Sequence, residues 1–135
     1  MSRPSLPVTV SPEEKRFLME CAFALRDARR EEESAAVFRG VLPLVDDKHL
    51  PLIGLGTIEF FGGRFDAAIE QFEEATRMAP TFALGYAHLG EALAFARQQE
   101  EAELALRKAS DLDPVGAEGG EMARTLQKFL AYGLL

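Results

Sequence analysis

Few residues in this sequence are of the kinds that perform chemistry, and their spacing does not match a catalytic or metal site. The chain contains one cysteine, Cys21, and two histidines, His49 and His88, which are far apart in the sequence. A zinc site needs three or four such ligands, usually with two of them a few residues apart. We therefore interpret Cys21 as a small core residue and His88 as a neighbour of a core leucine, and we predict neither a metal nor a cofactor.

Acidic pairs are a second candidate for chemistry, because neighbouring carboxyl groups can act as general acid and base. Such pairs occur at residues 73–74 and 100–101. Each is expected on the water-facing side of a helix, and Glu73 precedes Arg77 by four residues, the favourable order for an ion pair along a helix. We interpret these pairs as solvated helix faces and predict that the chain is not an enzyme.

Composition is typical of one soluble domain. The chain has 135 residues, 47% hydrophobic and 27% charged, and a net charge of −7. This negative charge repels nucleic acids and anionic membranes, so neither is expected as a partner. No apolar run approaches the roughly 18 residues of a membrane span, and residues 1–10, an expected extended segment, lack the apolar region of a signal peptide. We expect a cytoplasmic protein.

The sequence repeats with a constant spacing of 34 residues. Within each unit, large residues recur at helical spacing in two blocks, and small residues stand where two helices would approach most closely. Each unit is therefore predicted to be a helical hairpin. The equivalent positions are Leu18, Leu52 and Tyr86; Cys21, Leu55 and Leu89; Ala22, Gly56 and Gly90; Ser34, Ala68 and Ala102; and Phe38, Phe72 and Leu106.

This pattern resembles the tetratricopeptide repeat (TPR) family. The resemblance runs from Lys15 to about Gly116; the first unit is the loosest, with Ser34 where alanine is usual and Asp46 in place of a closing proline. It implies an all-α fold, a right-handed superhelix of three TPR hairpins with a C-terminal capping helix. The expected boundaries are residues 11–116 for the repeats, with units at about 15–48, 49–82 and 83–116, and residues 114–135 for the capping helix.

Local signals predict the helix ends. Ser11, Pro12 and Glu14 supply an N-cap, a first-turn proline and a capping-box acid, so the first helix is expected to start there. Asp113 followed by proline repeats the signal and predicts the start of the last helix. Pro43 is expected to shorten or kink the second helix.

Two adjacent phenylalanines, Phe60 and Phe61, raise a question, because neighbours on a helix point about 100° apart. The core stripe of the helix expected at residues 49–61 uses other positions. Both rings fall on a second stripe, which consists of Leu50, Ile53, Thr57, Phe60 and Phe61. By similarity to TPR proteins, this stripe lines the concave side and contacts a partner peptide.

The equivalent positions are Arg16, Met19, Phe23, Arg26 and Asp27 in the first unit and Leu84, Ala87, Glu91, Ala94 and Phe95 in the third. The predicted peptide-binding residues are Met19, Phe23, Leu50, Ile53, Thr57, Phe60, Phe61, Leu84, Ala87 and Phe95. The alternative is that the chain's own ends, "LPVTV" or Leu134 and Leu135, cover this surface. An apolar surface left open usually marks a binding site.

Among TPR families, the chain resembles the chaperones of type III secretion translocators in "IGLGTIEFFGGRFDAAIEQF", in "HLGEALAFARQQEEAELAL" and in Asp46. The resemblance implies a chaperone that holds an extended hydrophobic segment of another protein. A generic TPR scaffold that assembles a protein complex is the alternative. A carboxylate clamp is not expected, because the groove positions at which other TPR proteins carry the Lys and Asn of the clamp hold Met19, Phe23, Ile53, Thr57, Ala87 and Glu91 here. The apolar C-terminal "FLAYGLL" predicts a possible homodimer.

Overall fold

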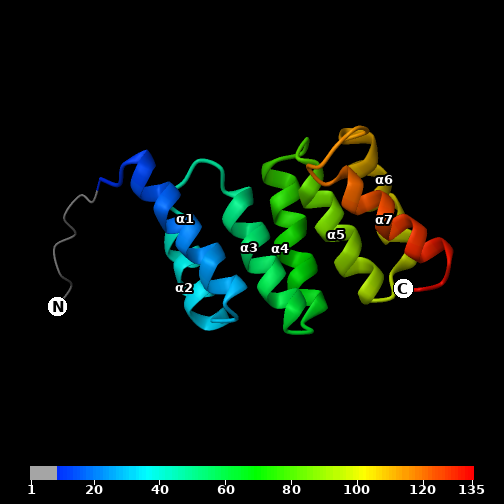
Figure 1. Ribbon diagram of the computed structural model, residues 1–135, viewed down its shortest axis with the longest axis horizontal. Helices are drawn as coiled ribbons and strands as arrows, with labels where there is room; N and C mark the ends of the chain where they lie inside the picture. Colours follow the sequence, from blue (N-terminus) through cyan, green and yellow to red (C-terminus); the bar gives the residue numbers. More distant parts are fainter. Residues whose placement is uncertain (1–8) are drawn as a thin grey trace.

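The structure of the protein is a computed structural model, which is described for residues 9–135 and forms one elongated row of antiparallel helices (Figure 1). Within these residues there are seven α-helices and no strand. The helices are α1 (Pro12–Asp27), α2 (Glu31–Val41), α3 (His49–Phe61), α4 (Phe65–Met78), α5 (Ala83–Phe95), α6 (Gln99–Leu112) and α7 (Gly120–Ala131). The predicted all-α class, with three hairpins and a terminal helix, is confirmed. Most of the predicted extended segment, residues 1–8, lies outside the described residues.

The ends of the first two helices follow from local chemistry. The Ser11 hydroxyl accepts a hydrogen bond from the Glu14 amide at 3.1 Å, and the Ser11 amide donates to the Glu14 carboxylate at 3.1 Å. This is the predicted capping box, and its hydrogen bonds hold the pKa of Glu14 below the usual value. Helix α2 ends at Val41, two residues before Pro43, because proline cannot continue the backbone ladder.

The turn inside each hairpin is the same structure repeated three times. The residues at its centre, Arg29, Gly63 and Arg97, have left-handed backbones with φ of 62°, 77° and 64°. The next amide in each turn donates at 2.9 Å to a carbonyl five residues earlier, which closes the helix end as a Schellman motif. Two arginines therefore occupy a conformation that favours glycine.

Close approach of the two helices in a hairpin depends on small residues that face large ones. Phe72 is fully buried, and a Cβ added to Gly56 would lie 2.4 Å from its ring. At the equivalent position in the third hairpin, a Cβ added to Gly90 would lie 2.5 Å from Leu106. Phe38 is different, because it packs against Gly54 of the next hairpin and so joins two repeats.

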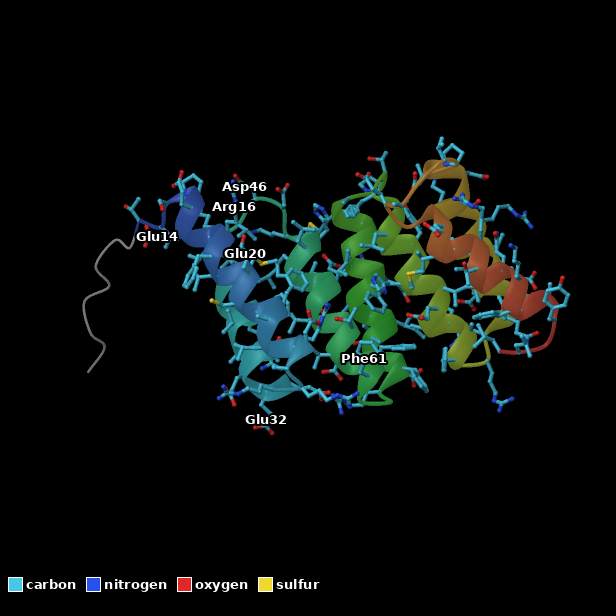
Figure 2. The ribbon with its side chains drawn as sticks, viewed as in Figure 1. Glu14, Arg16, Glu20, Glu32, Asp46 and Phe61 are labelled. Carbon is cyan, nitrogen blue, oxygen red and sulfur yellow. The ribbon has the colours of Figure 1, made fainter. Side chains whose placement is uncertain are left out.

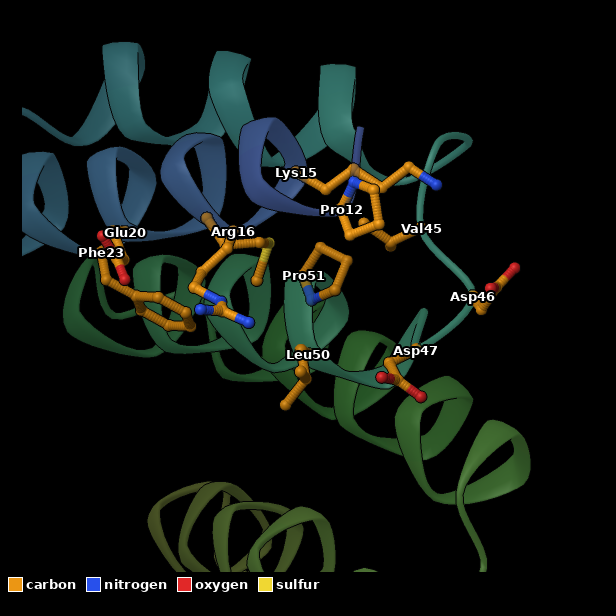
Figure 3. A pocket seen from close by; sticks show the side chains of 11 residues that line it. Pro12, Lys15, Arg16, Glu20, Phe23, Val45, Asp46, Asp47, Leu50 and Pro51 are labelled. Atoms are coloured by element: carbon orange, nitrogen blue, oxygen red, sulfur yellow. The ribbon is translucent and has the colours of Figure 1, made fainter. Parts of the chain in front are cut away.

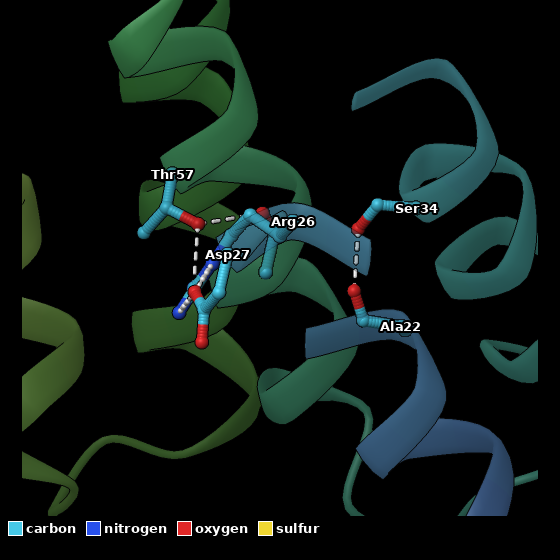
Figure 4. Close-up of polar contacts among 6 residues, drawn as sticks. Ala22, Arg26, Asp27, Ser34 and Thr57 are labelled. Atoms are coloured by element: carbon cyan, nitrogen blue, oxygen red, sulfur yellow. Dashed lines mark hydrogen bonds and ion pairs between the residues drawn. The ribbon is translucent and has the colours of Figure 1, made fainter. Parts of the chain in front are cut away.

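The serine at the crossing of the first hairpin is accommodated by a hydrogen bond. Ser34 is fully buried, and its hydroxyl donates to the Ala22 carbonyl at 2.6 Å (Figure 4). Its polar atom is therefore paired, as buried polar groups must be. The departure from the repeat pattern at Ser34 leaves the geometry of the crossing intact.

The predicted start of the last helix at Asp113 is wrong, because α7 begins at Gly120. The Asp113 carboxylate instead accepts hydrogen bonds from the amides of Glu118 at 2.8 Å and Gly120 at 3.1 Å, which folds residues 113–119 into a loop. Gly119 closes this loop with φ of 114°. Helix α7 then covers α5 and α6, where Ala123 and Leu126 join their apolar cluster. The capping position is as expected.

Enlarging the small residues at the hairpin crossings tests the packing. Ala68→Leu and Ala102→Leu should each lower the free energy of unfolding by about 1 to 3 kcal/mol, because both positions are fully buried and the neighbouring side chains cannot retreat. Urea unfolding followed by circular dichroism measures the change. Ala36→Leu, at an exposed position of α2, is the control, and equal stability of all three variants would contradict the crossing.

The repeated turn gives a second test, which concerns the backbone alone. Arg97→Gly should raise the free energy of unfolding by about 0.5 to 1 kcal/mol, because glycine adopts the left-handed conformation without strain. Gly63→Arg should lower it, although nothing lies within 4 Å of an added Cβ. The two variants are compared by thermal unfolding, and a change of the same sign in both would count against this explanation.

Candidate functional site

A pocket open to solvent lies between α1, α3 and the connection that joins α2 to α3 (Figure 3). Its volume is about 430 Å³. Six of its residues are apolar, and the other five are charged. The lining is Pro12, Lys15, Arg16, Met19, Glu20, Phe23, Val45, Asp46, Asp47, Leu50 and Pro51. A pocket of this kind can take an aliphatic or aromatic side chain while the backbone that carries it stays near polar groups.

Three of the predicted peptide-binding residues, Met19, Phe23 and Leu50, come together in this pocket. All three are half-buried. The Phe23 ring is held edge-on against the buried Phe38, with ring centroids 5.0 Å apart. The pocket wall is therefore a fixed part of the repeat packing, with one apolar side left open.

The connection between α2 and α3 is a part of the pocket that sequence reasoning missed. It spans residues 42–48 and is longer than its counterpart at residues 79–82 between α4 and α5. It adds Val45 and two aspartates to the lining. The greater length of this connection could have been predicted from the sequence, because Pro43 ends α2 early and Asp46 stands where a closing proline is usual.

A second apolar surface forms where α3 and α5 end, and it answers the question raised by the two phenylalanines. The Phe60 ring is half-buried among three others, with centroid distances of 5.0 Å to Phe95, 5.5 Å to Phe65 and 5.7 Å to Phe61. Phe61 is 72% exposed and Phe95 is 44% exposed. Phe60 therefore supports the surface from below. Phe61 lies exposed at the end of α3 (Figure 2).

Three other predicted contact residues, Ile53, Thr57 and Ala87, are buried. Neighbouring first helices pack against one another, α1 on α3 and α3 on α5, and this contact covers the middle of the predicted stripe. Ile53 joins the central apolar core, and Ala87 packs with residues of α6 and α7. The expectation of a continuous open stripe therefore needs correction, because these side chains offer a partner almost no accessible surface. Leu84, the remaining predicted residue, is half-buried, with its backbone against Gly119.

A polar group links α1 to α3 beside the Phe23 ring of the pocket (Figure 4). The Arg26 guanidinium donates from Nη1 to the Thr57 hydroxyl at 3.0 Å, and from Nε and Nη2 to Asp27 Oδ1 at 3.2 and 3.1 Å. Thr57 in turn donates to the Gly54 carbonyl at 2.7 Å. The Arg26 Cζ lies 5.0 Å from the centre of the Phe23 ring. The guanidinium is therefore fixed beside the pocket.

The histidines, the cysteine and the acidic pairs do not come together in one site. Within residues 9–135, no group of three or more His, Cys, Asp and Glu side chains is placed to hold a metal ion. The His88 ring stacks on Phe72 with centroids 5.3 Å apart, and Cys21 is half-buried. Arg77 pairs with Glu74 and not with the predicted Glu73. No helix in the described part of the chain is long and apolar enough to cross a membrane.

Comparison with known proteins supports the repeat assignment. The family model for the tetratricopeptide repeat matches residues 52–82 and 83–115, which hold the hairpins α3–α4 and α5–α6. The first hairpin, with Ser34 and Asp46, lies outside the match although its helices pair in the same way. A search of curated proteins gives no significant match.

Solved structures share the fold. PcrH from Pseudomonas aeruginosa is 16% identical, with 94% of this chain and 96% of that chain covered and a TM-score of 0.82. The type III secretion chaperone SycD from Yersinia enterocolitica, in complex with a peptide of the translocator YopD, is 23% identical, with 90% and 93% covered and a TM-score of 0.79. PcrH in complex with the chaperone binding region of PopB is 16% identical, with 86% and 94% covered and a TM-score of 0.77.

These similarities extend over nearly the whole length of both proteins and agree with the repeat match. The sequence identities are low, so they establish the fold. The chain contains two tetratricopeptide repeats, at residues 52–82 and 83–115, and has the fold of the type III secretion chaperone SycD and of PcrH.

Proposed function

We propose that the protein is a type III secretion-type chaperone that holds an extended hydrophobic segment of a partner protein. The observation that carries the proposal is the pair of open apolar surfaces on the first helices of the hairpins: the pocket around Met19, Phe23 and Leu50, and the aromatic surface with Phe61 and Phe95. Two similar structures, of SycD and PcrH, contain a translocator peptide or a chaperone binding region. This support favours a chaperone over a generic scaffold for folded partners.

The energetics favour a segment with at least two apolar anchors. Burial of one aliphatic or aromatic side chain contributes about 1.5 to 3 kcal/mol. Association costs roughly 4 kcal/mol or more in lost freedom, so one anchor would not give measurable binding. Anchors in both surfaces, with further contacts between them, give useful affinity. An extended backbone suits this arrangement, because it can present side chains to both surfaces in turn.

The proposal covers the setting of the protein as well. A hydrophobic translocator segment needs protection before export, so we expect the protein to act in the bacterial cytoplasm. Its role is binding, and no catalytic step is required of its side chains. The partner is a protein, and neither nucleic acid nor membrane takes part.

Phe61→Glu is the most direct test of the proposed surface. Because Phe61 is exposed, the variant should keep the wild-type melting temperature while binding to peptides selected from a phage-displayed random library falls at least about tenfold. Phe60→Glu should instead lower the melting temperature, because it places a charge among three rings.

The matched control is Phe17→Glu, at a position on α1 that is 64% exposed and does not line the pocket. It should bind the selected peptides as the wild type does. Equal binding by the Phe61 and Phe17 variants would refute the aromatic surface. Failure to select any peptide rich in aliphatic or aromatic residues would refute the chaperone proposal.

Self-association forms a separate part of the proposal. Phe129, Tyr132 and Leu134 at the end of the chain are exposed, whereas Leu130 and Leu135 pack against the core. A second copy that covers the three exposed side chains should give the mass of a dimer in light scattering at micromolar concentration. Phe129→Glu should reduce that mass to a monomer, and a monomeric wild type would refute self-association.

A further inference from the structure

Arg26 occupies the position between the two apolar surfaces, and this inference about it rests on the proposed function. Its guanidinium adjoins the pocket through the Phe23 ring and reaches α3 at Thr57, one helical turn before Phe61. A segment anchored in both surfaces has to pass this group. The side chain of Arg26 is 24% exposed, so a passing segment can touch it.

Hydrogen bonds hold Arg26 but do not use all its donors. A guanidinium carries five N–H groups. Within residues 9–135, Thr57 takes one from Nη1, and Asp27 takes one each from Nε and Nη2. One N–H on Nη1 and one on Nη2 are left for another acceptor. Because both helices fix the group, little side-chain freedom is lost when that acceptor binds.

The charge around Arg26 indicates which acceptor fits. Asp27 already balances the guanidinium through an ion pair at 3.1 Å. A carboxylate of the partner would lie beside the Asp27 carboxylate, and like charges in close contact oppose binding. A neutral carbonyl oxygen meets no such repulsion and can accept both remaining N–H groups through its two lone pairs.

We propose that Arg26 donates to a main-chain carbonyl of the bound segment and selects partners that are extended at this point. In an α-helix each interior carbonyl is already bonded to the amide four residues later. In an extended segment the carbonyl loses water when it enters an apolar groove, and without a donor this loss weakens binding. Arg26 supplies that donor, so it specifies the backbone state of the partner as well as its position.

The test uses the full chain and a peptide selected from the random library. Arg26→Gln should weaken binding of this peptide roughly 10- to 100-fold, as expected for a hydrogen bond from a charged donor. Each amide of the peptide is then replaced in turn by a thioamide, whose sulfur is a poor acceptor. One replacement should weaken binding to the wild type about tenfold and leave binding to the Arg26→Gln variant unchanged, which is the signature of direct coupling.

Two controls keep the test decisive. Arg39→Gln removes the same charge from an exposed position of α2 and should bind as the wild type does. Arg26→Lys keeps the charge but lacks the planar guanidinium, and it replaces Arg26→Gln in the test if that variant unfolds. The thioamide replacement should weaken binding less in Arg26→Lys than in the wild type. The proposal is wrong if Arg26→Gln is coupled to a change in an acidic side chain of the peptide. It is also wrong if no peptide position shows coupling to Arg26→Gln. Such a result would leave the chaperone function intact if Phe61→Glu still weakens peptide binding at least about tenfold.

Discussion

The structure depends on how closely the two helices of each hairpin approach. A fully buried ring or leucine on the second helix fits against a glycine on the first, at Phe72 and Gly56 and at Leu106 and Gly90. No Cβ can be added at these glycines without moving a buried side chain. This fit fixes the distance between the helices. Because Phe38 instead packs against Gly54 of the next hairpin, the same kind of contact also joins the repeats.

This tight packing determines where a partner can bind. The first helices of successive hairpins contact one another, so the middle of the predicted stripe is buried at Ile53, Thr57 and Ala87. Apart from Leu84, the predicted contact residues that stay accessible lie in two places: beside the long connection that follows α2, and where α3 and α5 end. The candidate site is therefore two separate apolar surfaces, and a partner segment has to be long enough to reach both.

The polar group between these surfaces has a structural role and leaves room for a binding role. Arg26 bridges α1 and α3 through Thr57, and Asp27 balances its charge. Because Asp27 pairs with Arg26 and the Arg26 side chain stays partly exposed, its charge does not carry the full desolvation penalty of a lone buried charge. It also places a charge beside exposed apolar residues, and large exposed apolar patches promote aggregation in soluble proteins.

The sequence alone determined the number and kind of elements. The 34-residue period predicted the helical hairpins, because large and small residues must alternate wherever two helices cross. The capping box at Ser11 and the early end of α2 before Pro43 were also predictable, since both depend on residues within one turn of the helix end. The first hairpin followed the same pattern, with the Ser34 hydroxyl paired to a buried carbonyl.

The tertiary structure decided what depends on contacts between distant residues. Phe60 and Phe61 lie on one predicted stripe, yet Phe60 is packed by Phe65 and Phe95 while Phe61 is exposed. Only the packing of α4 and α5 against α3 distinguishes them. The delayed start of α7 is similar, because the Asp113 carboxylate bonds amides further along the chain in preference to capping a helix. Helical period gives the direction of a side chain from its own helix, but its exposure depends on which neighbouring helix covers that direction.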